Sequence, residues 1–133
     1  MEAHAGRSLA PGPIVGGRFS VDFGAQAASE LLDSCERLTA IIAGGNQLMI
    51  GALKVLSERG LEVGRDISFL GCDDIPITSL HRPPIAVVRR DNEAIGRTAA
   101  DLLLRRLRDG AAESEIVLPT EFVPRPSCAV PSD

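Results

Sequence analysis

Short apolar runs alternate with longer segments of helical period along this chain, and this alternation restricts the fold more than any other feature. Three runs indicate buried strands: residues 39–43, 67–72 and 85–88. Between and after them, apolar residues recur every three or four positions, as on one face of an amphipathic helix. Apolar strands that alternate with such helices are typical of α/β proteins with a mostly parallel, doubly wound sheet, and we expect that fold class here.

Residues with capping chemistry stand at the starts of the predicted helices. Ser20 precedes the first helical segment, Asn46 the second, and either Asp91 or Asn92 the long third one. Their side-chain oxygens can accept hydrogen bonds from the free backbone N–H groups of a first turn. We therefore expect helices to begin at these positions.

Glycines mark the ends of two predicted helices. Gly60 and Gly110 follow the second and third helical segments, where a left-handed residue commonly ends a helix. Residues 14–15 are expected as a short strand, and 116–118 and 121–123 as extended segments. The expected order of elements is therefore β-α-β-α-β-β-α-β.

The composition is that of a folded chain without a nucleic-acid or membrane surface of its own. Hydrophobic residues make up 44% of the chain and charged residues 24%, with a formal net charge of −4. Nucleic-acid binding needs basic patches that displace phosphate counterions, so we expect no DNA binding by this chain alone. No apolar run approaches the ~20 residues of a membrane span. With no leader peptide apparent and three cysteines that form no Cys-x-x-Cys pair, we expect a cytoplasmic location.

Aromatic and polar residues follow the ends of successive predicted strands. Phe19 comes after the first strand, Gly45 and Asn46 after the second, and Asp73 after the third. Ligands of open parallel sheets bind beyond the carboxyl ends of the strands, so we expect these residues to converge at one edge. Asp73 could accept hydrogen bonds from a ligand, and Phe19 could stack on its ring. Each also has a structural alternative: a turn for Asp73, a helix cap for Asn46 and a core position for Phe19.

Catalytic, metal and cofactor sites are not indicated by the sequence. The adjacent carboxylates Asp73 and Asp74 suggest magnesium or phosphoacceptor chemistry, but such sites need further strand-end carboxylates and a nearby lysine. Lys54 lies inside a predicted helix, and Gly44 and Gly45 belong to no phosphate-loop motif. The serines and cysteines lack a nucleophile elbow. We expect no enzyme activity, no cofactor and no metal.

Four longer stretches contain linked motifs of a known protein family. They read GGRFSVDFGAQAASELL, TAIIAGGNQLMIGALKVLSERGLEVGRDISFLGCDDIP, RPPIAVVRRDNEAIGRTAADLLLRRLRDG and IVLPTEFVPRPS. Together they resemble the effector-binding domain of LacI-type bacterial transcription repressors, in one order and with ordinary spacing over about residues 11–127. The resemblance implies a periplasmic-binding-protein-like type I fold, in which two lobes enclose a small effector.

The resemblance also implies roles for individual effector-site residues. Asp73 corresponds to a carboxylate that binds the effector, and Phe19 to an aromatic residue that flanks it. The family usually has a hydrogen-bonding Asn where this chain has Gly45. We therefore expect Asn46 to substitute or the ligand to differ.

The partners implied by the resemblance are a small molecule and a second copy of the chain. Ile50, Lys54 and His81 fall where the family's dimer contacts lie. The effector is expected to be a sugar or nucleobase-like molecule, and DNA binding to require a helix-turn-helix headpiece absent from this chain. The alternative function is that of a transport-linked periplasmic sugar-binding protein of the same fold, which a secretion signal would favour.

The resemblance divides the chain into four parts. Residues 1–13 are a loop, 14–88 the core of the second lobe, 89–118 a helix and strand belonging to the first lobe, and 119–133 a return strand and tail. The family's headpiece, the rest of its first lobe and the opening β-α unit of the second lobe have no counterpart here. We therefore expect an incomplete domain.

An incomplete domain of this kind leaves apolar surface uncovered. The missing strand would lie between residues 14–15 and 39–43, so both would present unpaired edges. The predicted helix at 92–109 would also expose its apolar face, which carries Ile95, Leu102, Leu103 and Leu107. We expect the isolated chain to be marginally stable, oligomeric or dependent on a partner.

Overall fold

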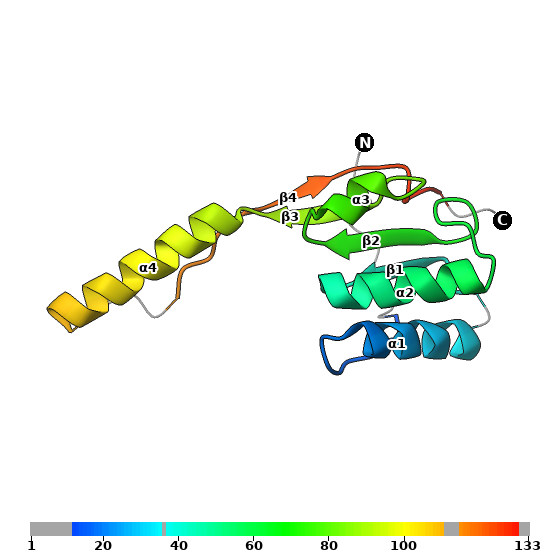
Figure 1. The fold of residues 1–133 in the computed structure, drawn as a ribbon, viewed down its shortest axis with the longest axis horizontal. Helices are drawn as coiled ribbons and strands as arrows, with labels where there is room; N and C mark the ends of the chain where they lie inside the picture. Colours follow the sequence, from blue (N-terminus) through cyan, green and yellow to red (C-terminus); the bar gives the residue numbers. More distant parts are fainter. Residues whose placement is uncertain (1–11, 36, 111–114, 131–133) are drawn as a thin grey trace.

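The structure, a computed structural model, describes residues 12–35, 37–110 and 115–130 (Figure 1). In chain order, the elements are α1 Val21–Ser34, β1 Ala40–Ala43, α2 Asn46–Glu58, β2 Ser68–Cys72, α3 Pro76–Leu80, β3 Ala86–Arg90, α4 Asn92–Asp109 and β4 Thr120–Val123. The strands form one sheet in the order β1-β2-β3-β4. The first three strands are parallel and β4 is antiparallel to β3, which confirms the α/β fold with a mostly parallel sheet.

The helices α2 and α3 cover the same face of the sheet. Each connects one parallel strand to the next in the same direction, and such crossovers are right-handed almost without exception. The helix α1 packs against α2 and extends this layer beyond β1 (Figure 1). The core lies between the helices and the sheet, and its largest fully buried apolar side chains are Met49, Leu56, Phe69, Ile85 and Val87.

Most of the predicted helix ends are confirmed. The Ser20 side chain accepts a hydrogen bond from the backbone N–H of Phe23 at 3.1 Å, and Asp91 accepts from Ala94 at 2.9 Å. Of the two residues considered for the start of α4, Asp91 is therefore the cap. Gly60 and Gly110 both adopt a left-handed φ of 69° after α2 and α4.

Two sequence predictions differ from the structure, and one helix was not predicted. Residues 14–15 are not a strand, because no described strand lies beside them to provide hydrogen bonds. Residues 116–118 are likewise unpaired. The short helix α3 was not expected, because its five residues begin with Pro76 and are too few to show a helical period.

The helices α1 and α2 approach each other closely through two glycines. A Cβ on Gly24 would lie 2.5 Å from the carbonyl oxygen of Leu48, and one on Gly51 would collide with the backbone of α1. Such distances are well inside van der Waals contact. The absence of a side chain at Gly24 and Gly51 therefore sets how closely the two helices pack.

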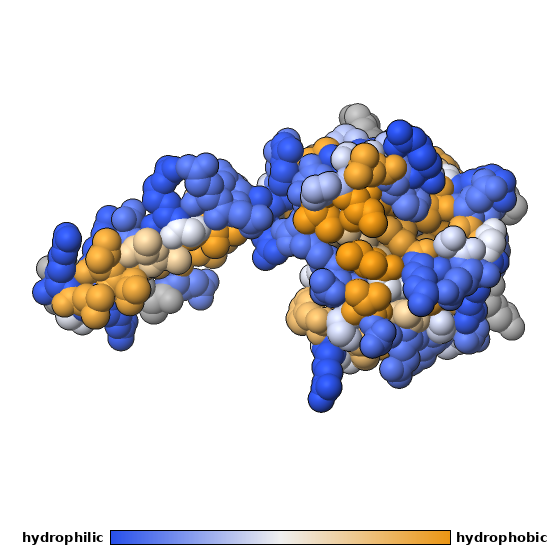
Figure 2. Space-filling view, viewed as in Figure 1, coloured by the Kyte–Doolittle hydropathy of each residue, from blue (hydrophilic) through white to orange (hydrophobic). Residues whose placement is uncertain are grey.

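The long helix α4 extends away from the rest of the described chain (Figure 1). It makes no extensive contact with any other described element, and Leu103 and Leu107 are exposed. Figure 2 shows apolar side chains gathered along the projecting helix. The exposed apolar face expected from the sequence is thus present. No helix within the described ranges is long and apolar enough to cross a membrane.

Ser127, which follows β4, links the two central strands β2 and β3 through hydrogen bonds. Ser127 is fully buried; its hydroxyl donates to the carbonyl oxygen of Phe69 in β2 at 2.6 Å and accepts from the N–H of Ala86 in β3 at 2.7 Å. The N–H of Phe69 in turn donates to the Ser127 carbonyl at 2.8 Å. The end of the chain is therefore part of the sheet's hydrogen bonding.

The close helix pairing gives the first prediction. Replacing Gly51 with alanine should destabilise the chain by about 1–3 kcal/mol, because the added methyl forces α1 away from α2. Urea unfolding followed by circular dichroism measures the effect. Gly96→Ala is the matched control, because a Cβ at Gly96 in α4 meets no atom within 4 Å and alanine favours helix. If Gly51→Ala unfolds at the same urea concentration as the parent, the glycine contact does not set the packing.

Candidate functional site

The carboxyl ends of the parallel strands meet at one edge of the sheet. Ala43, at the end of β1, is level with Gly71 of β2, and Cys72 is level with Val88 of β3. Gly45 and Asp73 follow the ends of neighbouring strands, so the structure brings them to the same edge as the sequence predicted.

The Phe19 side chain lies against Gly45. An added Cβ on Gly45 would lie 2.9 Å from two carbons of the Phe19 ring. Phe19 nevertheless remains 73% exposed, so it is not a core residue. Because a side chain on residue 45 would displace the ring, glycine here allows Phe19 to occupy this edge.

Asn46 is the first residue of α2 and not its N-cap. The cap is Gly45, which is extended and makes no side-chain hydrogen bond, so the expectation of an Asn46 cap is wrong. The Asn46 Oδ1 atom is buried and has no hydrogen-bond partner among the described residues. A buried carbonyl oxygen without a partner is destabilising by roughly 1–3 kcal/mol, which a donor from a bound molecule could offset.

The Asp73 carboxylate is held by a side chain that the sequence analysis did not identify. The Arg90 Nε donates to Asp73 Oδ1 at 2.6 Å, and a second guanidinium N–H donates to Oδ2. The Asp73 side chain is 12% exposed, and Arg90 is half exposed. Hydrogen bonding from Arg90 lowers the pKa of Asp73 below its ordinary value, and burial opposes this only in part. The signal in the sequence that could have indicated this partner is the pair Arg89-Arg90, which directly follows the apolar run at 85–88.

The backbone of Asp73 is also unusual. Its φ of 77° lies in the left-handed region, where Asp and Asn are tolerated better than most residues with a side chain. Its N–H donates to the carbonyl oxygen of Val88 in β3 at 2.9 Å. The carboxylate and the Arg90 guanidinium are thus fixed together at the strand ends, as an acceptor and a donor for a polar ligand.

The neighbouring Asp74 has a structural role. It accepts from the Thr78 hydroxyl at 2.7 Å and from Arg125 Nη2 at 2.8 Å. Hydrogen bonding from Thr78, together with Arg125, lowers the pKa of Asp74. Arg125 also donates to the Ile85 carbonyl at 3.0 Å, so this cluster ties α3 and the chain end to the sheet. The described residues contain no group of three His, Cys, Asp or Glu side chains placed to hold a metal.

The three residues expected at a dimer interface lie on α2 and directly after α3. Ile50 is partly exposed, and Lys54 is exposed with Glu58 at 3.8 Å. His81 follows α3, and its Nδ1 lies 2.7 Å from the Pro83 carbonyl oxygen. His81 also shares a surface depression with Leu53 of α2.

The helix α3 adds apolar surface that the sequence analysis missed. Leu80 is 71% exposed, and Ile77 is also exposed. Figure 2 shows apolar side chains gathered over α3 and toward α2. This surface could not be predicted from the sequence because the helix α3 itself was not predicted.

Comparison with known proteins identifies the family. The profile of the periplasmic binding protein-like domain matches residues 2–128. The chain belongs to this family. The lactose operon repressor of Rhizobium radiobacter is 36% identical over 109 residues, covering 82% of this chain and 96% of that protein. The lactose operon repressor of Escherichia coli is 31% identical over 116 residues, covering 87% of this chain and 32% of that protein.

A solved structure extends the relationship to the fold. The complex of the transcriptional regulator CelR with cellobiose superposes on this LacI-type chain with a TM-score of 0.75 and 33% identity. The match covers 84% of this chain and 35% of that one. The chain thus spans nearly all of the Rhizobium radiobacter relative but about a third of the Escherichia coli repressor and of CelR. Both of these curated relatives are named as lactose operon repressors.

The Asp73–Arg90 pair gives the second prediction. Asp73→Asn removes the charge and keeps a residue that tolerates the left-handed backbone. Because the pKa of Asp73 is lowered in the folded chain, its stabilisation is present above pH about 4 and is lost as the pH falls through the lowered pKa. The variant should therefore be less stable than the parent at pH 7, and the difference should shrink in acid.

Urea titrations of both proteins at pH 7 and near pH 3 measure this difference. Asp101→Asn, on the exposed surface of α4, is the control and should have little effect at either pH. A stability difference that is equally large at both pH values would show that the charge of Asp73 is not what stabilises this edge.

Proposed function

We propose that this chain is the ligand-sensing part of a LacI-type transcription regulator and that its ligand is a small hydroxylated molecule such as a sugar. DNA contact is proposed for a headpiece outside these 133 residues, and the regulator would act in the cytoplasm. The family assignment and the CelR–cellobiose complex support this function. The observation that favours it most is the exposed Phe19 ring at the sheet edge that also carries Asp73 and Arg90.

The chemistry of this edge suits a sugar. The apolar face of a sugar ring can stack on an exposed aromatic ring such as Phe19. Its hydroxyls can donate to the Asp73 carboxylate and accept from Arg90, because each hydroxyl is both donor and acceptor. A ligand hydroxyl could also donate to the unpaired Asn46 Oδ1. Gly45 contributes space and no hydrogen bond.

A thermal-shift screen with mono- and disaccharides tests the ligand. A ligand that binds the folded chain raises its melting temperature in proportion to the logarithm of ligand excess, so we expect a dose-dependent rise with at least one sugar. Asp73→Ala and Phe19→Ala should abolish it. Phe122→Ala, at an exposed aromatic residue on β4, should retain it. An unchanged shift in both site variants would refute this site.

We further propose that two copies associate through the outer surface of α2 and α3, which carries Ile50, Lys54, Ile77, Leu80 and His81. The support is the exposure of Ile77 and Leu80 together with the family's usual dimer contacts. An apolar surface of this kind would be buried between the two subunits.

Sedimentation velocity of two arginine variants tests this interface. Leu80→Arg should convert a dimer into a monomer, because it places a charge in the proposed contact. Leu107→Arg is the matched control on the equally apolar but distant surface of α4 and should leave the dimer intact. If Leu107→Arg dissociates the dimer and Leu80→Arg does not, α4 is the interface and the proposal is wrong.

A further inference from the structure

The Arg90 guanidinium uses only part of its hydrogen-bonding capacity. Its Nε and Nη2 atoms donate to the two carboxylate oxygens of Asp73, and its Nη1 atom has no partner among the described residues. A guanidinium carries five N–H donors in one plane, so the edge formed by Nη1 and the second N–H of Nη2 points away from Asp73. The Arg90 side chain is 52% exposed, and this outer edge is open to a ligand.

The pair with Asp73 fixes the direction of that outer edge. Two parallel N–H···O bonds hold the planar guanidinium in one orientation, so little of its freedom remains to be lost when a ligand binds. The Asp73 carboxylate is much less exposed than Arg90. A neutral ligand that displaced Arg90 would leave a mostly buried charge without its partner, which is strongly destabilising. The favoured arrangement therefore keeps the pair intact and places the ligand on the Arg90 side.

A polar cavity of about 510 Å³ adjoins Arg90 at the same edge of the sheet. Arg90 is the last residue of β3 and is level with Thr120, the first residue of the antiparallel strand β4. The cavity is lined by these two residues together with Arg89, Asp91, Asn92, Pro119 and Glu121. It therefore lies where β3 ends, β4 begins and α4 begins.

Both carboxylates that line the cavity already have partners. Asp91 Oδ1 accepts from the backbone N–H of Ala94 at 2.9 Å, as the cap of α4. Glu121 Oε2 accepts from Arg89 Nη2 at 2.7 Å. Neither acid is therefore an unused acceptor that would select a ligand rich in donors.

Several donors at the cavity are unused. The side chains of Asn92 and Thr120, like the Nη1 atom of Arg90, make no hydrogen bond to another described residue. The start of α4 adds to them, because the first N–H groups of a helix have no partner within it and carry a partial positive charge. A carboxylate or phosphate supplies charged acceptor oxygens, and a guanidinium edge binds two of them side by side. The unused groups therefore fit an oxyanion.

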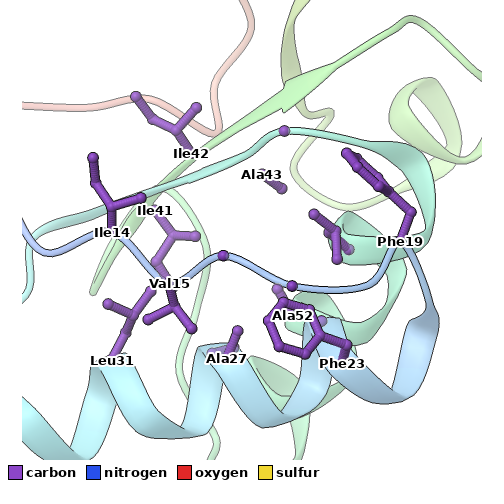
Figure 3. Close-up of a pocket in the computed structure, with 16 residues that line it drawn as sticks. Ile14, Val15, Phe19, Phe23, Ala27, Leu31, Ile41, Ile42, Ala43 and Ala52 are labelled. Atoms are coloured by element: carbon purple, nitrogen blue, oxygen red, sulfur yellow. The ribbon is translucent and has the colours of Figure 1, made fainter.

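The cavity and the Phe19 ring lie along one edge of the sheet. Phe19 contacts Gly45 after β1 and lines an apolar groove of about 470 Å³ beside that strand. Figure 3 shows this groove, with Ala27 and Leu31 of α1 on its floor. Arg90 ends β3, the second strand from β1, and neighbouring strands are about 4.8 Å apart, so the two features are separated by about 10 Å. One sugar with an attached acidic group can reach both.

We propose that the ligand of this edge is an acidic sugar, whose hydroxylated ring lies at Phe19 and whose carboxylate or phosphate binds the outer edge of Arg90 in the polar cavity. This inference rests on the proposed sugar-sensing function and narrows it to one chemical class. Arg90 is then the residue that determines specificity for the acidic group, and Asp73 holds its guanidinium in place.

Matched neutral and acidic sugars test this class. Isothermal titration calorimetry of the full chain, at one fixed ionic strength, compares glucose with glucuronate and with glucose phosphorylated on its primary hydroxyl, and galactose with galacturonate. We expect at least one acidic sugar to bind about tenfold more tightly than its neutral counterpart, because hydrogen bonds between charged groups are the stronger ones. Added salt should reduce this preference. The comparison of glucuronate with the phosphorylated glucose shows which oxyanion the cavity takes.

Variants at the cavity locate the acidic group. Asn92→Asp adds a carboxylate beside Arg90 without removing the Asp73 pair, and an acidic residue in a first turn favours the helix, so the fold is retained. It should weaken binding of the acidic sugar by about tenfold and leave the neutral sugar unchanged. Arg90→Gln should also remove the preference, with its fold checked by circular dichroism. Arg105→Gln, at an exposed position of α4, removes the same charge and should keep the preference.

The outcomes separate this inference from the function on which it rests. Equal affinity for neutral and acidic sugars would overturn the acidic class and leave sugar sensing in place, whereas no binding by any sugar would refute both. A preference that survives Asn92→Asp and Arg90→Gln would show that the acidic group binds elsewhere. If acetate or inorganic phosphate alone binds as tightly as the acidic sugar, the cavity holds an adventitious ion only, and the inference is wrong.

Discussion

The close approach of α1 to α2 at Gly24 and Gly51 is the contact on which the apolar side of the candidate site depends. It places α1 beside the edge strand β1 and not directly over the sheet, so α1 forms the floor of a groove. It also fixes the start of α1, where Ser20 caps the helix, and so holds the preceding Phe19 next to Gly45. The two glycines thus position both the Phe19 ring and the apolar groove beside β1.

The polar part of the sheet edge depends on a second, longer-range interaction. The left-handed Asp73 ends β2 and its carboxylate binds Arg90 at the end of β3. The pair joins neighbouring strands at the point where their ladder stops. Because Arg90 is half exposed, it stabilises the edge and remains available to a ligand.

Local signals in the sequence predicted most of the elements but not their long-range partners. The capping residues Ser20 and Asp91 and the terminal Gly110 marked real helix ends, because a cap acts within one turn. The position of Asn46 was misjudged by one residue, because Gly45 takes the extended conformation that a cap requires. Residues 14–15 have the composition of a strand, but strand structure needs a neighbour to pair with, and the described chain provides none.

The candidate site was predictable to a similar extent. The convergence of Gly45 and Asp73 follows from parallel topology alone. The partners of the two carboxylates, Arg90 and Arg125, lie 17 and 51 residues away in the sequence, and spacing over such lengths contains no geometric information. The surface of α3 was missed because a single turn started by a proline leaves no apolar period to detect.

The buried hydroxyl of Ser127 has a consequence for how the chain is made. Its bridge between Phe69 and Ala86 comes from near the end of the described chain, yet it completes hydrogen bonds in the two central strands. A ribosome that has synthesised α1 to β3 has therefore not yet provided all the groups that those strands need. The sheet therefore reaches its final hydrogen bonding only after Ser127 has been translated and has joined β2 and β3.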